Sequence, residues 1–225
     1  MTQRRLLAAA IGSVTLLAGV AAAAKPPSTW DGLVLVESKR LDIVYLQQGA
    51  DFREYSKVIL EPTEVAFRKN WRRDYNSSHR NLSSRISDQD VQQAISGGVT
   101  AANEIFAQAW SKAGYQVVTA PGPDVLRVKT GVINIDVSAP DTRSAAPIRT
   151  YADEAGSATL FIEARDSLTG ALLGRAVDQR VAGDHTIGDR TRMTNRGDFR
   201  DLVEEWAAIT VRGMAELKQL SPVQP

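Results

Sequence analysis

The most unusual chemistry in the sequence is a run of basic and aromatic residues between positions 67 and 80. It interleaves five cations with three rings: Phe67, Arg68, Lys69, Trp71, Arg72, Arg73, Tyr75 and Arg80. If these side chains are exposed, the rings would stack on sugars or insert at an interface, and the guanidinium groups would pair with phosphates or carboxylates. Six of these residues form our candidate binding surface: Arg68, Lys69, Trp71, Arg72, Arg73 and Tyr75. In the alternative, the rings pack into the core and the cations pair with Glu61, Glu64 and Asp74.

A second candidate is the polar segment 183–197, which lies between two glycines. It carries six charged or titratable residues: Asp184, His185, Asp189, Arg190, Arg192 and Arg196. Long polar loops on a rigid scaffold often hold function, and this one could capture an anion ahead of the last helix. The alternative is a flexible connector.

Signatures of catalysis are scarce. The chain has no Cys, which excludes thiol nucleophiles, disulfides, Cys-ligated zinc and iron–sulfur clusters. The two histidines, His79 and His185, lie too far apart for any local ligand motif, so we expect neither a metal nor a cofactor. The sequence contains no G-x-S-x-G, P-loop or dinucleotide fingerprint. The glycine pair within 96–98 lies in a helical pattern and is expected to serve packing.

One carboxylate pair stays open as a hydrolytic site. Glu163 and Asp178 lie on two strands that are predicted to face each other, and two carboxylates can hydrolyse a glycosidic bond. Cross-strand ion pairs with Arg175 and Arg180 explain both acids more simply. We therefore predict a protein without catalytic activity, with a carboxylate-dependent hydrolase as the alternative.

The N-terminus has the three parts of a secretory signal peptide. Arg4 and Arg5 precede an apolar stretch at 6–20, and Ala22 to Ala24 form a small-residue cleavage site. Cleavage after Ala24 would place the chain in the periplasm or outside the cell. The alternative is an uncleaved anchor, because positions 6–24 carry no charge. A partial twin-arginine signal is a further interpretation.

The net charge and the absence of Cys limit the classes of binding partner that we expect. Without residues 1–24 the chain has 25 basic and 26 acidic residues, whereas nucleic-acid binders carry a basic excess. No Cys follows the cleavage site, so we expect no lipid anchor there. The expected partners are another envelope protein or an anionic lipid or glycan, and not nucleic acid.

Two long helices must position these residues. Ser87 and Asp90 form a capping box, and apolar residues at helical spacing continue to Gly114, which predicts a helix over 88–113. A second helix is predicted from Asp198 as N-cap to Leu220, before a Ser-Pro pair stops it.

The remaining elements have strand periodicity. Strands are predicted at 33–36, 42–46, 57–67 with a break at 61–62, 115–120, 125–137, 158–165 and 171–181. Residues 166–170 are predicted to form the loop of a hairpin. In the strand at 125–137, the apolar residues change from even to odd positions near Gly131, which predicts a β-bulge there. The fold class is α+β: a single mixed or mainly antiparallel sheet with both helices on one face. We expect one domain over 30–222, after a signal peptide (1–24) and an extended leader (25–29).

Five stretches together resemble a known family. They are 30–34, 67–76, 120–126, 154–159 and 166–175. On these residues the chain resembles domain of unknown function 3313, an uncharacterised bacterial envelope family composed mostly of lipoproteins. The resemblance spans about 30–222 and implies no established activity, and this chain lacks the lipobox Cys of many members. The element order is also similar to the small α/β domain of outer-membrane assembly lipoproteins related to curli secretion and peptidoglycan-synthase activation, an analogy of fold alone.

Overall fold

The computed structural model describes residues 25–78, 85–137, 150–152, 156–182, 188–190 and 192–224. Its helices are α1 (Trp71–Ser78), α2 (Asp88–Lys112) and α3 (Arg192–Leu220). The main sheet contains β1 (Thr29–Trp30), β2 (Leu33–Val36), β3 (Ile43–Leu46), β4 (Lys57–Leu60), β5 (Glu64–Phe67), β6 (Gln116–Val117), β7 (Val125–Val137), β9 (Gly156–Asp166) and β10 (Leu172–Ala182). Two further strands, β8 (Thr150–Ala152) and β11 (Gly188–Arg190), pair with each other.

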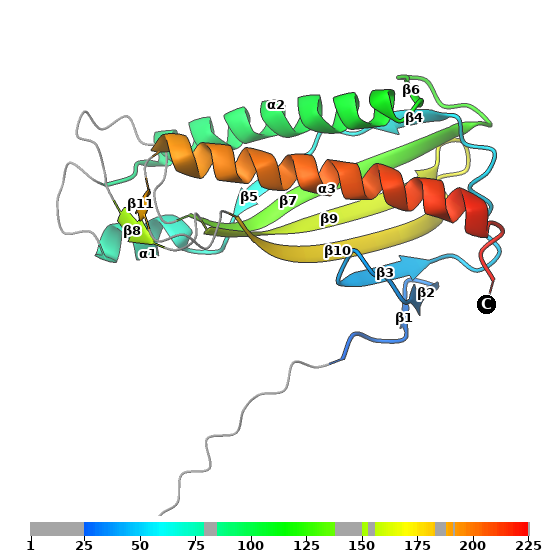
Figure 1. Ribbon diagram of the computed structural model, residues 1–225, viewed down its shortest axis with the longest axis horizontal. Helices are drawn as coiled ribbons and strands as arrows, with labels where there is room; N and C mark the ends of the chain where they lie inside the picture. Colours follow the sequence, from blue (N-terminus) through cyan, green and yellow to red (C-terminus); the bar gives the residue numbers. More distant parts are fainter. Residues whose placement is uncertain are drawn as a thin grey trace, which may run out of the picture.

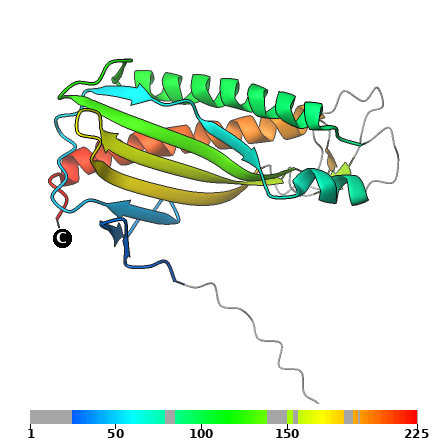
Figure 2. The ribbon, with the colours of Figure 1, turned by 180° about the vertical axis from the view of Figure 1, so that it is seen from behind.

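The architecture is two layers, and it confirms the predicted α+β class. The nine-stranded sheet has the order β1-β2-β3-β10-β9-β7-β4-β6, with β5 also pairing β7. Strands β4 and β5 run parallel to β7, whereas β7, β9, β10 and β3 form antiparallel pairs. Helices α2 and α3 lie side by side across one face (Figure 1). In the described part of the chain, the opposite face carries no helix (Figure 2).

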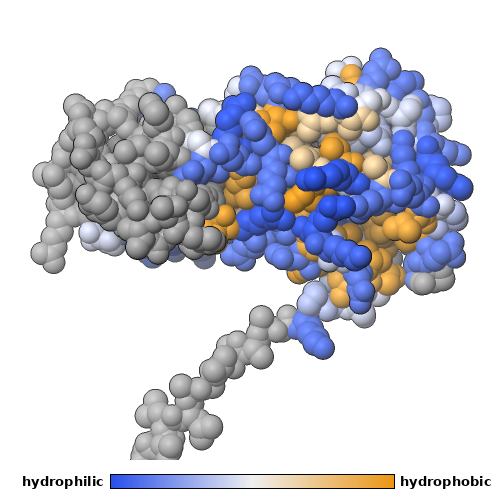
Figure 3. All heavy atoms as spheres, in the orientation of Figure 1, coloured by the Kyte–Doolittle hydropathy of each residue, from blue (hydrophilic) through white to orange (hydrophobic). Residues whose placement is uncertain are grey.

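The core lies between the helices and the sheet. Its largest fully buried side chains include Trp110 and Phe106 of α2, Trp206 of α3, and Leu126 and Leu160 of the sheet. Apolar atoms are visible between the two helices, whose outward sides are hydrophilic (Figure 3). Burial of such aromatic and aliphatic side chains is the main force that holds the two layers together. Among the described residues, no helix is long and apolar enough to cross a membrane.

The central hairpin and the first long helix agree with the sequence. Strands β9 and β10 pair from end to end with one irregularity between Leu172 and Gly174, and Gly170 in their loop has a φ of 71°. Helix α2 begins after Ser87, whose side chain accepts from the backbone N–H of Asp90 while Asp90 accepts from the backbone of Ser87. Both features were predictable because each depends on residues that are neighbours in sequence.

The start of α3 corrects the sequence prediction. The helix begins at Arg192 rather than after Asp198, and it ends at Leu220 as expected. An N-cap residue type is compatible with a helix start but does not enforce one, and packing of the apolar stripe stabilises most of a helix in a protein. The predicted loop 183–197 is therefore partly strand β11 and partly the first turns of α3. Its residues 183–187 and 191 lie outside the described residues.

Two strand predictions also change. The irregularity in β7 lies between Ile133 and Asp136 and not at Gly131, which pairs in register with Phe161. Asn134 adopts a φ of 53° there, and Asn tolerates this left-handed conformation better than most residues. The strand predicted over 115–120 is only two residues long, and it begins after Tyr115 because the N–H of Tyr115 still donates to Trp110 O at the end of α2. The break within 57–67 is confirmed, since β4 and β5 are separate strands.

Candidate functional site

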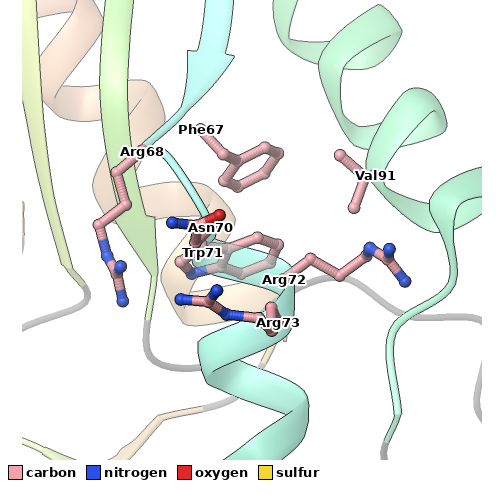
Figure 4. A pocket seen from close by; sticks show the side chains of 7 residues that line it. All are labelled: Phe67, Arg68, Asn70, Trp71, Arg72, Arg73 and Val91. Carbon is pink, nitrogen blue, oxygen red and sulfur yellow. The ribbon is translucent and has the colours of Figure 1, made fainter.

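The basic and aromatic residues gather where the chain leaves the sheet and enters α1. We define residues 67–73 as the β5–α1 corner, which connects the end of β5 to the first turn of the helix (Figure 4). Asn70 lies in the turn of this corner and adopts a left-handed backbone conformation with a φ of 64°. The other end of α1 is held by Asn76, which exchanges two hydrogen bonds of 2.8 Å with the backbone of Ile86. The corner is thus fixed between the sheet and the start of α2.

Both rings of the candidate surface are buried. Trp71 is 3% exposed and Tyr75 is 7% exposed. Phe67 stacks on Trp71 with 4.2 Å between ring centroids, and the indole Nε1–H donates to the carbonyl of Val137 at 3.3 Å. Burial raises the pKa of the Tyr75 hydroxyl. Trp71 and Tyr75 therefore pack in the core, as the alternative interpretation expected, and do not form an open stacking platform.

Arg68 forms ion pairs with two carboxylates. Its Nε lies 2.6 Å from Asp136 and its Nη1 lies 2.8 Å from Asp74. The hydrogen bond with Asp74, followed by that with Asp136, raises the pKa of the Arg68 guanidinium. In return, the Arg68 hydrogen bond lowers the pKa of Asp74. Arg68 thus holds the end of β7 against the start of α1.

The other cations are more open to solvent. Arg72 pairs with Asp88 at 3.0 Å, and the two side chains are 43% and 84% exposed. Arg73 is 72% exposed and shares Asp74 with Arg68, at 3.2 Å. Lys69 is exposed and takes part in no ion pair with the described residues. These three cations keep hydrogen-bond donors available to a ligand.

The prediction that Glu61, Glu64 and Asp74 pair with the cations of this run is only partly confirmed. Asp74 does pair with the corner, through Arg68 and Arg73. Glu61 instead pairs with Arg127 at 3.4 Å, and Glu64 with Lys129 at 3.8 Å, because both acids lie beside β7.

An open hollow of about 280 Å³ lies at the corner, between the start of α1 and the start of α2 (Figure 4). Seven residues line it: Phe67, Arg68, Asn70, Trp71, Arg72, Arg73 and Val91. Its apolar wall consists of two rings and a valine. All charged residues in the lining are arginines. Asp74, Asp88 and Asp136 form ion pairs with these arginines but do not line the hollow themselves. The arrangement suits an anion that carries an apolar group.

The carboxylates considered for hydrolysis do not meet. Glu163 faces Arg175 directly across the β9–β10 ladder, whereas Asp178 stands opposite Leu160 on the face that the helices cover. Glu163 accepts from Arg165 at 2.6 Å and from Arg175 at 2.8 Å. Two carboxylates on opposite faces of one sheet cannot act on the same bond, so this pair is no hydrolytic site.

The remaining candidates give little structure to interpret. His79, Arg80, Asp184 and His185 lie outside the described residues, and the side chains of Asp189, Arg190, Arg192 and Arg196 are likewise not described. Within the described ranges, no group of three or more His, Cys, Asp or Glu side chains could hold a metal ion.

Sequence reasoning missed α1 itself. It carries Trp71 and Tyr75 at i and i+4, the spacing that buries one side of a helix, and this was the available signal. The adjacent cations obscured it, because a short helix with so few apolar residues depends on tertiary contacts.

Comparisons with known proteins identify the family. The family model described as "Protein of unknown function (DUF3313)" matches residues 28–209, which confirms the resemblance found in the sequence. No curated protein matches the sequence. Among solved structures, the chain is similar to a PelC dodecamer from Paraburkholderia phytofirmans at 11% identity and a TM-score of 0.38, covering 76% of this chain and 95% of that chain. It is also similar to a DUF330 protein from Xanthomonas campestris at 8% identity and a TM-score of 0.42, covering 76% and 88%. A minor lipoprotein from Acinetobacter baumannii matches at 10% identity and a TM-score of 0.32, covering 72% and 94%.

Proposed function

We propose that this chain, which belongs to the DUF3313 family of proteins of unknown function, is a non-catalytic binding or assembly protein of the cell envelope. The single observation that carries the proposal is the hollow at the β5–α1 corner, whose charged lining consists of Arg68, Arg72 and Arg73. The proposed location rests on the signal-peptide pattern at residues 1–24.

The chemistry of this hollow favours binding over catalysis. A guanidinium group stays protonated at any physiological pH, so it donates hydrogen bonds but does not transfer a proton. None of the lining residues is a carboxylate, a histidine or a lysine. The hollow can therefore hold and orient a negatively charged group without a general acid or base of its own.

The edges of the sheet support the corner as the binding surface. The outermost strands of the main sheet are β1 and β6, with two residues each, and β5, which pairs only with β7 and has four residues. A partner that adds a strand to a sheet needs a longer row of free backbone groups. Short edges of this kind protect a sheet from such pairing, so the proposed partner engages side chains at the corner.

Photo-crosslinking in cells tests the proposal. A photoreactive residue at position 73 lies on a side chain that is 72% exposed, whereas position 71 would be buried. The matched control is position 108, an exposed glutamine on α2 outside the hollow. We expect a discrete adduct from position 73, absent from position 108 and lost when Arg72→Ala is added. The same adduct from both positions, or none from position 73, would contradict the proposal.

A further inference from the structure

We propose that the hollow at the β5–α1 corner binds a phosphate ester that carries an apolar group. This inference rests on the proposed binding role and adds the chemical class of the ligand. Three features of the hollow carry it: the number of guanidinium groups, the weakness of their present pairs, and the apolar wall beside them.

The donors favour phosphate over a single carboxylate. Each Arg has five N–H donors, and the ion pair of Arg72 places its Nε 3.0 Å from Asp88. Arg73 uses Nε and Nη2 toward one oxygen of Asp74. A carboxylate has two oxygens, and Asp74 and Glu163 each engage two guanidinium groups with them. A phosphate ester with three acceptor oxygens and a larger negative charge can engage a third guanidinium group as well.

The present ion pairs can exchange for a ligand. Asp88 is 84% exposed, and ion pairs between such exposed side chains contribute little stability. Asp74 is shared between Arg68 and Arg73, so releasing Arg73 leaves the carboxylate paired. Arg72 and Arg73 leave α1 in different directions and flank Trp71 (Figure 4). An anion seated over this turn would therefore meet side chains that are free to rearrange.

The apolar wall and the size of the hollow define the rest of the ligand. Phe67 and Val91 are half-buried, and the edge of Trp71 completes the wall. The volume of about 280 Å³ is slightly below the ~300–1,000 Å³ of pockets that enclose drug-sized ligands. The hollow thus accommodates a phosphate and the first few carbons of its substituent, and the rest of the ligand extends into solvent.

Calorimetric titration of the full chain tests the ligand class. The probes are hexyl phosphate, inorganic phosphate and hexanol. We expect hexyl phosphate to bind about tenfold or more tighter than either fragment, because only it fills both parts of the hollow. Equal affinity for hexyl phosphate and inorganic phosphate would overturn the role of the apolar wall, and no binding of hexyl phosphate would overturn the inference.

A matched pair of double variants tests the site. Arg72→Ala with Arg73→Ala should weaken hexyl phosphate binding about tenfold or more. Arg200→Ala with Arg212→Ala removes the same charge from the exposed side of α3 and should change binding by less than about twofold. Equal losses in both variants would indicate unspecific attraction and overturn the site. Thermal unfolding of both variants verifies that each one folds.

Vesicle co-sedimentation distinguishes the two sources of such a phosphate. Pelleting with phosphatidylglycerol but not phosphatidylcholine vesicles, lost in the Arg72 and Arg73 double variant, would assign the ligand to a membrane lipid. Hexyl phosphate binding without such pelleting would assign it to a free phosphate ester. A protein adduct from position 73 without hexyl phosphate binding would overturn this ligand class and leave the proposed binding role in place.

Discussion

Asp178 is a charged residue that is buried between the sheet and the helices. It is 2% exposed and accepts three hydrogen bonds: from Trp206 Nε1 at 2.8 Å, from the backbone N–H of Asp42 at 3.0 Å and from Arg180 Nε at 2.6 Å. These donors come from α3, from the residue that precedes β3, and from β10 itself. A buried carboxylate is stable only when such partners replace its lost hydration.

Asp178→Ala should therefore destabilise the fold strongly. The variant leaves the buried Trp206 N–H without its acceptor and removes one of the acceptors of Arg180, which keeps Glu205 and the carbonyl of Arg40, so we expect the free energy of unfolding to fall by about 2–3 kcal/mol. Urea denaturation measures the loss. Asp201→Ala, at an exposed position on α3, should change stability by less than about 0.5 kcal/mol. Similar losses in the two variants would contradict this role of Asp178.

Glu163 holds a second ion-pair network on the face without helices. The guanidinium of its partner Arg175 stacks on the ring of Trp30, 4.6 Å from the centroid, and also pairs with Asp31 at 2.5 Å. Burial alone would raise the pKa of Glu163, but the hydrogen bonds from Arg175 and Arg165 outweigh it and lower the pKa below its usual range. The carboxylate is thus held in its charged form.

This lowered pKa predicts a pH-dependent stability. A group with a depressed pKa in the folded state stabilises the fold above its unfolded pKa, about 4.3 for Glu, and loses this contribution as the pH falls through the folded pKa. Glu163→Gln should be less stable than the parent at pH 7, and the difference should shrink between about pH 5 and pH 3. Urea denaturation across this range measures it, with Glu204→Gln on α3 as the surface control. A difference that does not change with pH would argue against the prediction.

At the scale of elements, two glycines have opposite surroundings. Gly156 begins β9 with a φ of 144°, and a Cβ there would lie 1.9 Å from the carbonyl oxygen of Asp136 in β7. Gly97 lies in α2 with open space where a Cβ would point. The first glycine permits close approach of two strands, whereas the second only weakens a helix.

Alanine at these two positions should change stability in opposite directions. Gly156→Ala introduces both a clash and backbone strain, and we expect a loss of more than about 2 kcal/mol. Gly97→Ala, the matched control, should gain about 0.5–1 kcal/mol because alanine favours a helix. Thermal unfolding compares the two variants. A stabilising Gly156→Ala would show that β9 does not approach β7 in this way.

The predictability of each element follows from how local its stabilising contacts are. The capping box of α2 and the β9–β10 hairpin depend on residues a few positions apart, and the sequence predicted both. Helix α1 depends on Asn76 reaching the backbone of Ile86 and on Trp71 entering the core. These contacts join α1 to other parts of the chain, so the i, i+4 spacing of Trp71 and Tyr75 was not sufficient to predict the helix.

At the scale of the whole molecule, the C-terminal tail joins α3 to the segment between β3 and β4. Val223 is 8% exposed, its N–H donates to Ala50 O at 2.9 Å, and its carbonyl accepts from Gly49 N at 2.9 Å. Ser221 Oγ accepts from the backbone N–H of Phe52 at 2.9 Å. These hydrogen bonds hold the segment between β3 and β4 at the C-terminal end of α3.

Truncation after Leu220 should destabilise the whole domain. It removes these backbone pairs and the buried valine, and we expect the melting temperature to fall by about 4 °C or more. Truncation after Gln224 removes only the last residue and should leave the melting temperature unchanged. Differential scanning calorimetry of the two shortened chains provides the comparison, and equal melting temperatures would contradict a structural role for the tail.

The candidate site was predicted as a segment but not as a surface. The run at 67–80 identified the right part of the chain, yet residue types alone could not separate buried rings from exposed cations. The structure made that separation because α1 turns Trp71 toward the core and leaves Arg72 and Arg73 open to solvent. The position of Asp88 beside Arg72 depends on how α2 is placed, which is a tertiary property.

By itself, the sequence determined the family, the α+β class, the long helices and the hairpin, because hydrophobic periodicity and caps are written in local spacing. Only the tertiary structure decided which residues share a face. It placed Glu163 and Asp178 on opposite faces of the sheet, although their strands are adjacent, and it brought Val91 of α2 beside the arginines of the β5–α1 corner. The physical reason is that strand register and helix placement are set by packing of the whole core, where contacts join residues far apart along the chain.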